Sequence, residues 1–444
     1  MPEASPQPPR RFKAEKLDKV LFLVRRAHDS LLHCVITFAC QLDAERLEKA
    51  VRLSLQAEEI LACRFINGKW RQYWETRPDL DQLDVVRLIQ TKDLEGDVGN
   101  YLATPIAHLD APLIQVRIFR STIDTLCLKI NHMVADAGGV KDYMTLLASI
   151  YRNLAKDPNY RPAVNTSGNR SPNQLWQHFS FSDRLKILRR GFRDWQNELF
   201  PPRNWCYPFR KAPLSGRKFI IHRIDPARYR PVKKYAQQHG VTLNDIMVAA
   251  FLRSLHEILR PAFNVPMRLG TTVDLRRYLP NRKALGICNL SGVFKLNFGT
   301  KLGESIRETV QLVHDRMQEH KADYLGLGDS RYFMFGELVP HPWAVWAFHK
   351  VKRLNQMLST KEVSPALTNM GIISREQVNF GDAPVVDAFL TPPLVLPPLF
   401  LIGLSGFEES LTASLGFCES GIPQSTVVDL LNNVESQLAK LTGK

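Results

Sequence analysis

One stretch of the chain, TLCLKINHMVADAGGVKDYMTLLASIY at residues 125–151, constrains the fold most. Its first part, Thr125 to Asn131, is apolar and β-branched and predicts a strand. A glycine pair follows, and the amphipathic pattern of residues 140–154 predicts a helix. His132 and Asp136 lie in the turn between them. Side chains at a strand end are suited to chemistry, because the sheet fixes their backbone while the turn leaves them accessible.

The same succession of strand and helix occurs in both halves of the chain. In the first half, residues 31–42 predict a strand and 43–61 a helix. In the second half, residues 218–224 predict a strand, and a helix follows over 241–259. No short repeat relates the halves, and 444 residues exceed what one hydrophobic core usually serves. The sequence therefore predicts an α/β fold with mixed sheets, built as two related lobes.

Composition along the chain suggests where the lobes are divided. We expect a first lobe at 12–182, a linker with a basic helix at 183–217 and a second lobe at 218–444. Residues 156–182 are rich in Pro, Asn and Ser, which is typical of a loop. The first 16 residues are proline-rich and basic, and we interpret them as a disordered leader rather than a secretory signal. The uncharged run 388–407 contains four prolines, so no transmembrane segment is predicted.

The net charge of +15 would attract anions, such as phosphorylated cofactors, acidic proteins or anionic membranes. The basic residues are scattered and no nucleic-acid-binding motif accompanies them, so a nucleic-acid partner is not expected. Seven cysteines without a C-x-x-C pair favour a reducing, cytoplasmic location. No histidine spacing favours metal ligation, and no metal site is expected.

The residue types of the turn also suggest roles. A free imidazole has a pKa near 6.5 and can take a proton from a hydroxyl, amine or thiol nucleophile. The default alternative is that His132 is an ordinary polar core residue. Asp136 is harder to interpret as a second catalytic group, because a buried carboxylate needs a cationic or hydrogen-bonding partner. We therefore expect Asp136 to tie the turn down through an arginine.

The motif NHMVADAGG, residues 131–139, resembles the HHxxxDG motif of the chloramphenicol acetyltransferase superfamily. This group includes condensation domains of peptide synthetases, alcohol acetyltransferases and wax ester synthases. Further segments resemble the family in the expected order: TTVDLRRYL from Thr271, GICNLSGVF around Asn289, and ALTNMGII with Asn369. The resemblance spans residues 12–441.

The resemblance implies a role for each matching residue. His132 would be the general base that deprotonates the acceptor as it attacks an acyl thioester. Asp136 would be structural, with Arg276 as its partner, and Gly138 would supply backbone freedom. Oxyanion donors would come from two asparagines, Asn289 and Asn369.

Two positions depart from the motif. Asn131 replaces the first histidine, which many members of the family tolerate because the second does the chemistry. Ala137 replaces the glycine that normally follows the aspartate. The resemblance therefore gives weaker support for a backbone amide of this turn as a hydrogen-bond donor to substrate.

The resemblance also implies a fold and a reaction. The two lobes would meet in a V around a central tunnel, with the thioester donor entering from one face and the acceptor from the other. The donor would be acyl-CoA or the phosphopantetheine arm of an acyl carrier protein, as a co-substrate rather than a covalently bound cofactor. The protein would be a monomeric acyltransferase acting on an alcohol, with an amine as the less favoured acceptor. The alternative is a catalytically silent module that binds a lipid or a carrier protein.

Aromatic and basic residues alternate between Arg331 and Leu358. Such a segment can lie on an anionic membrane, which would make the contact peripheral and the acceptor lipid-like. The alternative is that its aromatic residues belong to the core or line an apolar tunnel.

Overall fold

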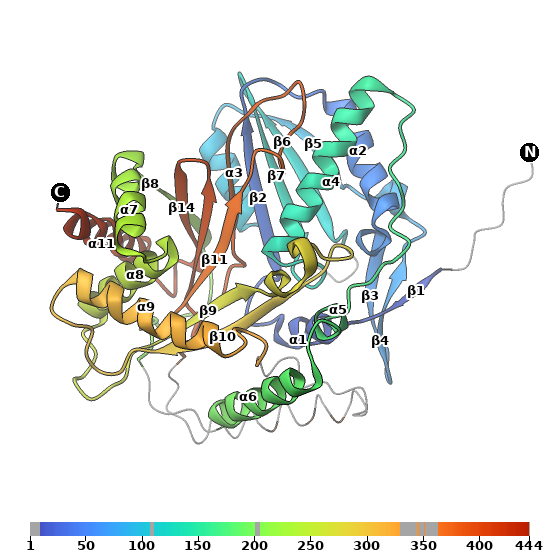
Figure 1. The fold of residues 1–444 in the computed structure, drawn as a ribbon. Coiled ribbons are helices and arrows are strands. Elements are labelled where there is room, and N and C mark those ends of the chain that lie inside the picture. The colour runs from blue at the N-terminus through green and yellow to red at the C-terminus, as the bar shows by residue number, and fades with distance from the viewer. Residues whose placement is uncertain are drawn as a thin grey trace, which may run out of the picture.

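The computed structural model describes residues 9–106, 111–199, 205–328 and 363–443, together with Trp343, Trp346 and Lys350. In the helix that ends at residue 199, side chains are described as far as residue 194. The described chain forms two lobes, each built on a mixed sheet with covering helices (Figure 1). The α/β class predicted from the sequence is confirmed.

The first lobe contains a five-stranded sheet in the order β12-β2-β7-β6-β5. Its strands are β2 (Leu31–Phe38), β5 (Val86–Gln90), β6 (Ile114–Arg120), β7 (Asp124–Asn131) and β12 (Val385–Thr391). β2 and β7 are antiparallel and place Leu31 opposite Asn131. The helices of this lobe are α1 (Lys16–Val24), α2 (Ala44–Ala57), α3 (Leu94–Ala103) and α4 (Ala137–Lys156). A small sheet in the order β1-β4-β3 completes the lobe, with β1 (Arg11–Lys13), β3 (Cys63–Asn67) and β4 (Gln72–Thr76).

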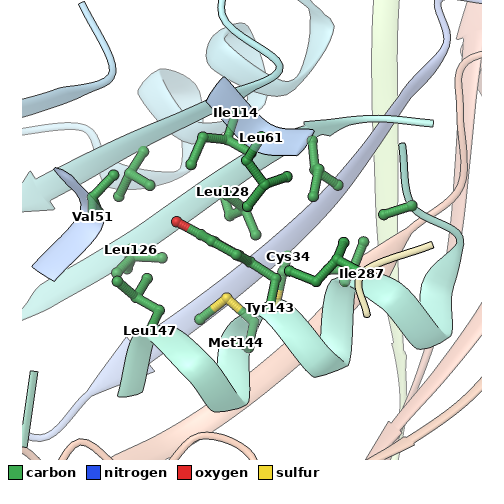
Figure 2. Close-up of a cluster of buried hydrophobic side chains, with 14 of the residues drawn as sticks. Cys34, Val51, Leu61, Ile114, Leu126, Leu128, Tyr143, Met144, Leu147 and Ile287 are labelled. Atoms are coloured by element: carbon green, nitrogen blue, oxygen red, sulfur yellow. The ribbon is translucent and has the colours of Figure 1, made fainter. Parts of the chain in front are cut away.

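The core beneath α4 fixes the position of the β7–α4 turn. Figure 2 shows Tyr143, Met144 and Leu147 of α4 among apolar side chains of the sheet and α2. Tyr143 is fully buried and its hydroxyl lies 3.2 Å from Ser54 Oγ. Because these side chains interlock, neither the strand end nor the helix start can move independently.

The second lobe contains a six-stranded sheet in the order β10-β9-β11-β13-β14-β8. Its strands are β8 (Arg217–Ile224), β9 (Arg268–Asp274), β10 (Ser291–Asn297), β11 (Ala366–Ile373), β13 (Leu401–Phe407) and β14 (Ser410–Cys418). Its helices are α7 (Pro226–His239), α8 (Leu243–Leu259), α9 (Ile306–Ala322) and α11 (Gln424–Thr442).

The two lobes do not correspond to two separate stretches of the sequence. β12 belongs to the second half of the sequence but pairs with β2 of the first lobe. Arg217, at the start of β8, donates to the buried Asp29 carboxylate at 2.8 Å and to Ala103 O at 3.1 Å. The expected second lobe, 218–444, therefore contributes one strand to the first lobe.

One expected segment differs from the structure, and one lies outside it. The presumed loop at 156–182 contains the short helix α5 (Asn173–Trp176), and α6 (Phe181–Leu199) follows. The uncharged run 388–407 includes part of β12 and all of β13, and no described helix is long and apolar enough to span a bilayer. The aromatic and basic segment from 331 to 358 falls almost entirely outside the described residues.

Candidate active site

His132 follows directly after the last residue of β7. Its backbone N–H donates to Ser30 O at 2.8 Å, and its half-buried ring places Nδ1 2.9 Å from Ala135 O. A carbonyl oxygen can only accept, so Nδ1 carries the proton in this hydrogen bond. In the neutral ring, Nε2 is then the basic nitrogen.

Asn289 brings the second lobe to the backbone of His132. Its Nδ2 donates to His132 O at 3.1 Å, and it also lies 3.5 Å from Nδ1 of the ring. Both nitrogens are donors in the tautomer described above, so the carbonyl is the true partner. Asn289 Oδ1 in turn accepts from the N–H and the hydroxyl of Ser291. The buried amide therefore fixes the strand end on which His132 sits.

Asp136 caps α4 and is fully engaged in structural bonds. Its Oδ1 accepts from Gly139 N at 2.8 Å, and its Oδ2 accepts from Leu290 N at 2.7 Å. Arg276 Nη1 donates to both carboxylate oxygens, at 2.9 and 3.0 Å. The ion pair expected between Asp136 and Arg276 is present. Both oxygens of the Asp136 carboxylate are engaged in these bonds, so it is not placed to transfer a proton to substrate.

Arg276 lies in a 3₁₀ turn after β9 and is buried with its partner. Its Nη2 donates to Cys288 O at 3.0 Å. Burial disfavours the guanidinium charge, but Asp136 and the neighbouring carboxylates hold the pKa of Arg276 well above its usual value. The β7–α4 turn of the first lobe is thus locked to the second lobe by a permanent charge.

Gly138 is needed for space rather than for backbone freedom. A Cβ at this position would lie 2.3 Å from Arg276 Nη1 and 2.7 Å from its Cζ. Its φ lies outside the left-handed region, so the expectation that it supplies backbone freedom is wrong. The guanidinium packs directly on the glycine, and any side chain would displace it.

Replacing Gly138 with alanine should therefore destabilise the protein by about 1–3 kcal/mol, the usual cost of overpacking a rigid site. Denaturant unfolding measures this loss. Gly99→Ala in α3 is the matched control, because an added Cβ there would meet nothing within 4 Å. That change should leave stability equal or raise it by about 0.5–1 kcal/mol. Equal effects of the two substitutions would contradict the packing argument.

Asn369 is exposed on β11 and makes its described contacts within the second lobe. Its Nδ2 donates to Asn244 Oδ1 at 3.0 Å, and its Oδ1 accepts from Gly371 N at 2.9 Å. Gly371 has a φ of 79° at an irregularity in the pairing of β11. These contacts fasten the irregular strand, and none of the described ones reaches His132.

Arg170 is a buried residue of the site that the sequence did not reveal. Both of its terminal nitrogens donate to the Asp18 carboxylate, at 2.8 and 3.0 Å, and Trp74 Nε1 donates to the same carboxylate at 2.7 Å. Arg170 Nη2 also donates to the carbonyls of Met133 and Val134, at 3.1 and 3.3 Å. The turn that carries His132 is therefore held by Arg170 as well as by Arg276.

His28 is a second imidazole close to the site, and no motif or spacing in the sequence indicates it. Its Nδ1 accepts from Ser30 N at 2.9 Å, so the ring is held neutral with its proton on Nε2. Ser30 has a φ of 55°, a strained value for a residue other than glycine, and its carbonyl accepts from His132 N. His28 thus stabilises the turn on which the backbone of His132 rests.

The stability of the protein should depend on pH through His28. Burial, with the nearby His132, lowers the pKa of His28 to about 4. The unfolded chain binds this proton near pH 6.5 and the folded chain does not. Stability from this group is therefore complete above pH 6.5 and is lost as the pH falls towards 4. We expect a loss of about 2 kcal/mol, allowing for partial exposure.

His28→Asn keeps an acceptor for Ser30 N but does not titrate, so it should remove this contribution. Unfolding free energies of both proteins at about pH 7 and about pH 4.5 measure it. If the wild type and His28→Asn lost the same unfolding free energy between these two pH values, His28 would have an ordinary pKa and the prediction would be wrong.

Among the residues that the structure describes, no three His, Cys, Asp or Glu side chains are grouped as metal ligands. His222 pairs with Glu435, and His314 pairs with Asp245.

Comparison with known proteins identifies structures that share the fold of this chain. No protein-family model matches the chain, and a search of curated proteins finds no match. Solved structures do match it over nearly its whole length. The first condensation domain of the CDA synthetase is 18% identical, with a TM-score of 0.71 over 98% of this chain and 97% of that one.

Two other matches are an acetyltransferase and a protein associated with a polyketide synthase. The TRI3 trichothecene 15-O-acetyltransferase of Fusarium sporotrichioides is 12% identical, with a TM-score of 0.72 over 97% of this chain and 94% of that one. Polyketide synthase associated protein 5 of Mycobacterium tuberculosis is 15% identical, with a TM-score of 0.69 over 98% of both chains. The chain therefore has the two-lobed chloramphenicol acetyltransferase-like fold.

Proposed function

We propose that the protein is an acyltransferase that moves an acyl group from a thioester to an alcohol, with His132 as the general base. The observation that carries this proposal is the hydrogen bond from His132 Nδ1 to Ala135 O, because it makes Nε2 the basic nitrogen. An imidazole held in one tautomer at a strand end is suited to proton transfer. The fold shared with condensation domains and an acetyltransferase supports acyl transfer in general.

The reaction would follow directly from this geometry. Nε2 takes the hydroxyl proton as the acceptor oxygen attacks the thioester carbonyl carbon. The tetrahedral intermediate then collapses, the C–S bond breaks, and the imidazolium returns the proton to the leaving thiolate. The carbonyl of Ala135 would keep the ring oriented throughout, because Nδ1 remains protonated in both states. An amine acceptor would follow the same steps and is the less favoured choice.

The oxyanion of the intermediate needs a hydrogen-bond donor. Of the two expected asparagines, Asn289 lies nearer to His132 and stays the first candidate through the second N–H of its Nδ2, because the other donates to His132 O on the Nδ1 side of the ring. Asn369 remains the second candidate. Asp136, Gly138 and Arg276 would support the site by holding the turn.

The donor would be acyl-CoA or an acyl carrier protein, and its pantetheine arm would reach His132 along a passage between the lobes. The net charge of +15 would favour the phosphates of either donor.

Release of free thiol from acyl-CoA tests the proposal. The purified protein is incubated with acyl-CoAs of several chain lengths and with panels of alcohols and amines. Thiol release that requires an acceptor, with the matching ester or amide found by mass spectrometry, is the expected result. A chain that binds acyl-CoA or an acylated carrier protein but releases no thiol with any acceptor would instead be the catalytically silent module.

A further inference from the structure

The helix α6 exposes a line of large apolar side chains. Phe181, Leu185, Leu188 and Phe192 are 84%, 40%, 47% and 57% exposed. Their spacing places them within about 60° of one another around the helix, at about 100° per residue. A surface helix normally turns such a stripe towards the core. Here the stripe is exposed instead, and α6 lies at the lower edge of the described helices and strands (Figure 1).

The opposite face of α6 is anchored, so the direction of the stripe is fixed. Ile187 is fully buried and belongs to a small core that includes Leu327. The buried Arg190 forms an ion pair with Asp323 at 3.2 Å. The Tyr324 hydroxyl donates to the Asp183 carboxylate near the start of the helix. Rotation of α6 to hide its apolar stripe would break these contacts.

The outer face is also basic. Arg184 is exposed on one side of the stripe and Arg189 on the other. Lys186 lies further round, as does Arg193, which pairs with Asp323 at 3.0 Å. In the part of α6 with described side chains, the acidic residues lie on the anchored side. Asp183 is engaged with Tyr324, and Asp194 with Arg190. The apolar stripe is therefore bordered by cations.

We propose that this outer face of α6 docks the protein on an anionic membrane surface. The phenylalanine and leucine side chains would enter the boundary between headgroups and acyl chains, and the arginines and lysine would lie at the phosphates. A convex single helix with a narrow apolar stripe and a basic border is the arrangement that such a boundary accepts. A second copy is a poorer occupant, because it would bring two basic faces together. The inference is independent of acyl transfer and goes beyond the proposed function.

Vesicle co-sedimentation tests the proposal with the full chain. Vesicles of phosphatidylcholine, with or without phosphatidylglycerol, are the probes, at low and high salt. The wild type should bind the anionic vesicles at low salt and bind more weakly at high salt, because salt screens the arginines and lysine. Leu188→Gln with Phe192→Gln should weaken binding at least about tenfold.

Lys186→Gln and Arg189→Gln should each weaken binding roughly fivefold, the effect of one cation near an anionic surface. Phe263→Gln is the matched control, because Phe263 is 90% exposed in the second lobe, and it should leave binding unchanged. The near-ultraviolet circular dichroism of each variant should match the wild type.

Absence of wild-type binding to either kind of vesicle would overturn the proposal, as would binding that the α6 variants leave unchanged. Equal binding to vesicles without phosphatidylglycerol would overturn it as well. A dimer in sedimentation velocity that Leu188→Gln with Phe192→Gln abolishes would assign the face to a second copy instead. Because the readout is binding, an inactive enzyme would not affect the result.

Discussion

Replacing His132 with alanine should lower kcat/KM for acyl transfer by about 10²–10⁴-fold, the usual contribution of a positioned general base. The alanine removes Nε2, which the hydrogen bond from Nδ1 to Ala135 O makes the basic nitrogen of the ring. Thiol release from acyl-CoA in the presence of the best acceptor measures the loss. The backbone bonds of residue 132 to Ser30 and Asn289 do not involve the ring and are kept, so only the ring's hydrogen bond to Ala135 O is lost and stability should fall by about 0.5–1.5 kcal/mol.

His222→Ala is the matched control for this variant. His222 is on β8 and pairs with Glu435, so its loss should leave kcat/KM unchanged. The wild type should also lose activity as the pH falls, because protonation of Nε2 removes the base, and His132→Ala should lack this acid limb. A rate and pH profile in His132→Ala equal to those of the wild type would exclude the imidazole as the base.

Elements defined by local pattern can be predicted from the sequence. Periodicity predicts the strand at β7 and the helix at α4, and both are confirmed. The helix begins at Ala137 rather than at 140, because Asp136 is its cap and the glycine pair forms its first turn. From the pattern alone, Gly138 and Gly139 are expected in the turn before the helix. In the structure its glycines permit the close approach of Arg276 and of Cys288 O.

Contacts between distant segments cannot be predicted in this way. Arg170 lies 152 residues from Asp18, in a stretch whose Pro, Asn and Ser content is typical of a linker. Nothing in the spacing of either residue shows that they meet in the core. The strand β12 escapes prediction because it overlaps a proline-rich apolar run, and its partner β2 is more than 300 residues away.

The same distinction between local pattern and distant contacts applies to the residues of the candidate site. The pairing of Asp136 with Arg276 is implied by ordered motifs and is present. The two asparagines are equivalent in the sequence, and only the tertiary structure separates them. Asn289 contacts the backbone of His132, whereas Asn369 fastens β11 through Asn244 and Gly371.

Replacing Arg276 with methionine should destabilise the protein by about 3–5 kcal/mol, the usual cost of removing one member of a buried ion pair. The carboxylate of Asp136 would keep its bonds from Gly139 N and Leu290 N, but its charge would stay buried without a cation. Cys288 O would lose a donor as well. The midpoint of urea unfolding, followed by tryptophan fluorescence, measures the effect.

Arg277→Met is the matched control, because Arg277 is the next residue along the chain and is exposed. It should change stability by less than about 0.5 kcal/mol. Adding Asp136→Asn to Arg276→Met removes the uncompensated charge, so the double variant should be more stable than the sum of the two single losses predicts. Equal unfolding midpoints for Arg276→Met and Arg277→Met would mean that the buried pair does not hold the β7–α4 turn. The position of His132 would then have to depend on Arg170 and Asn289 alone.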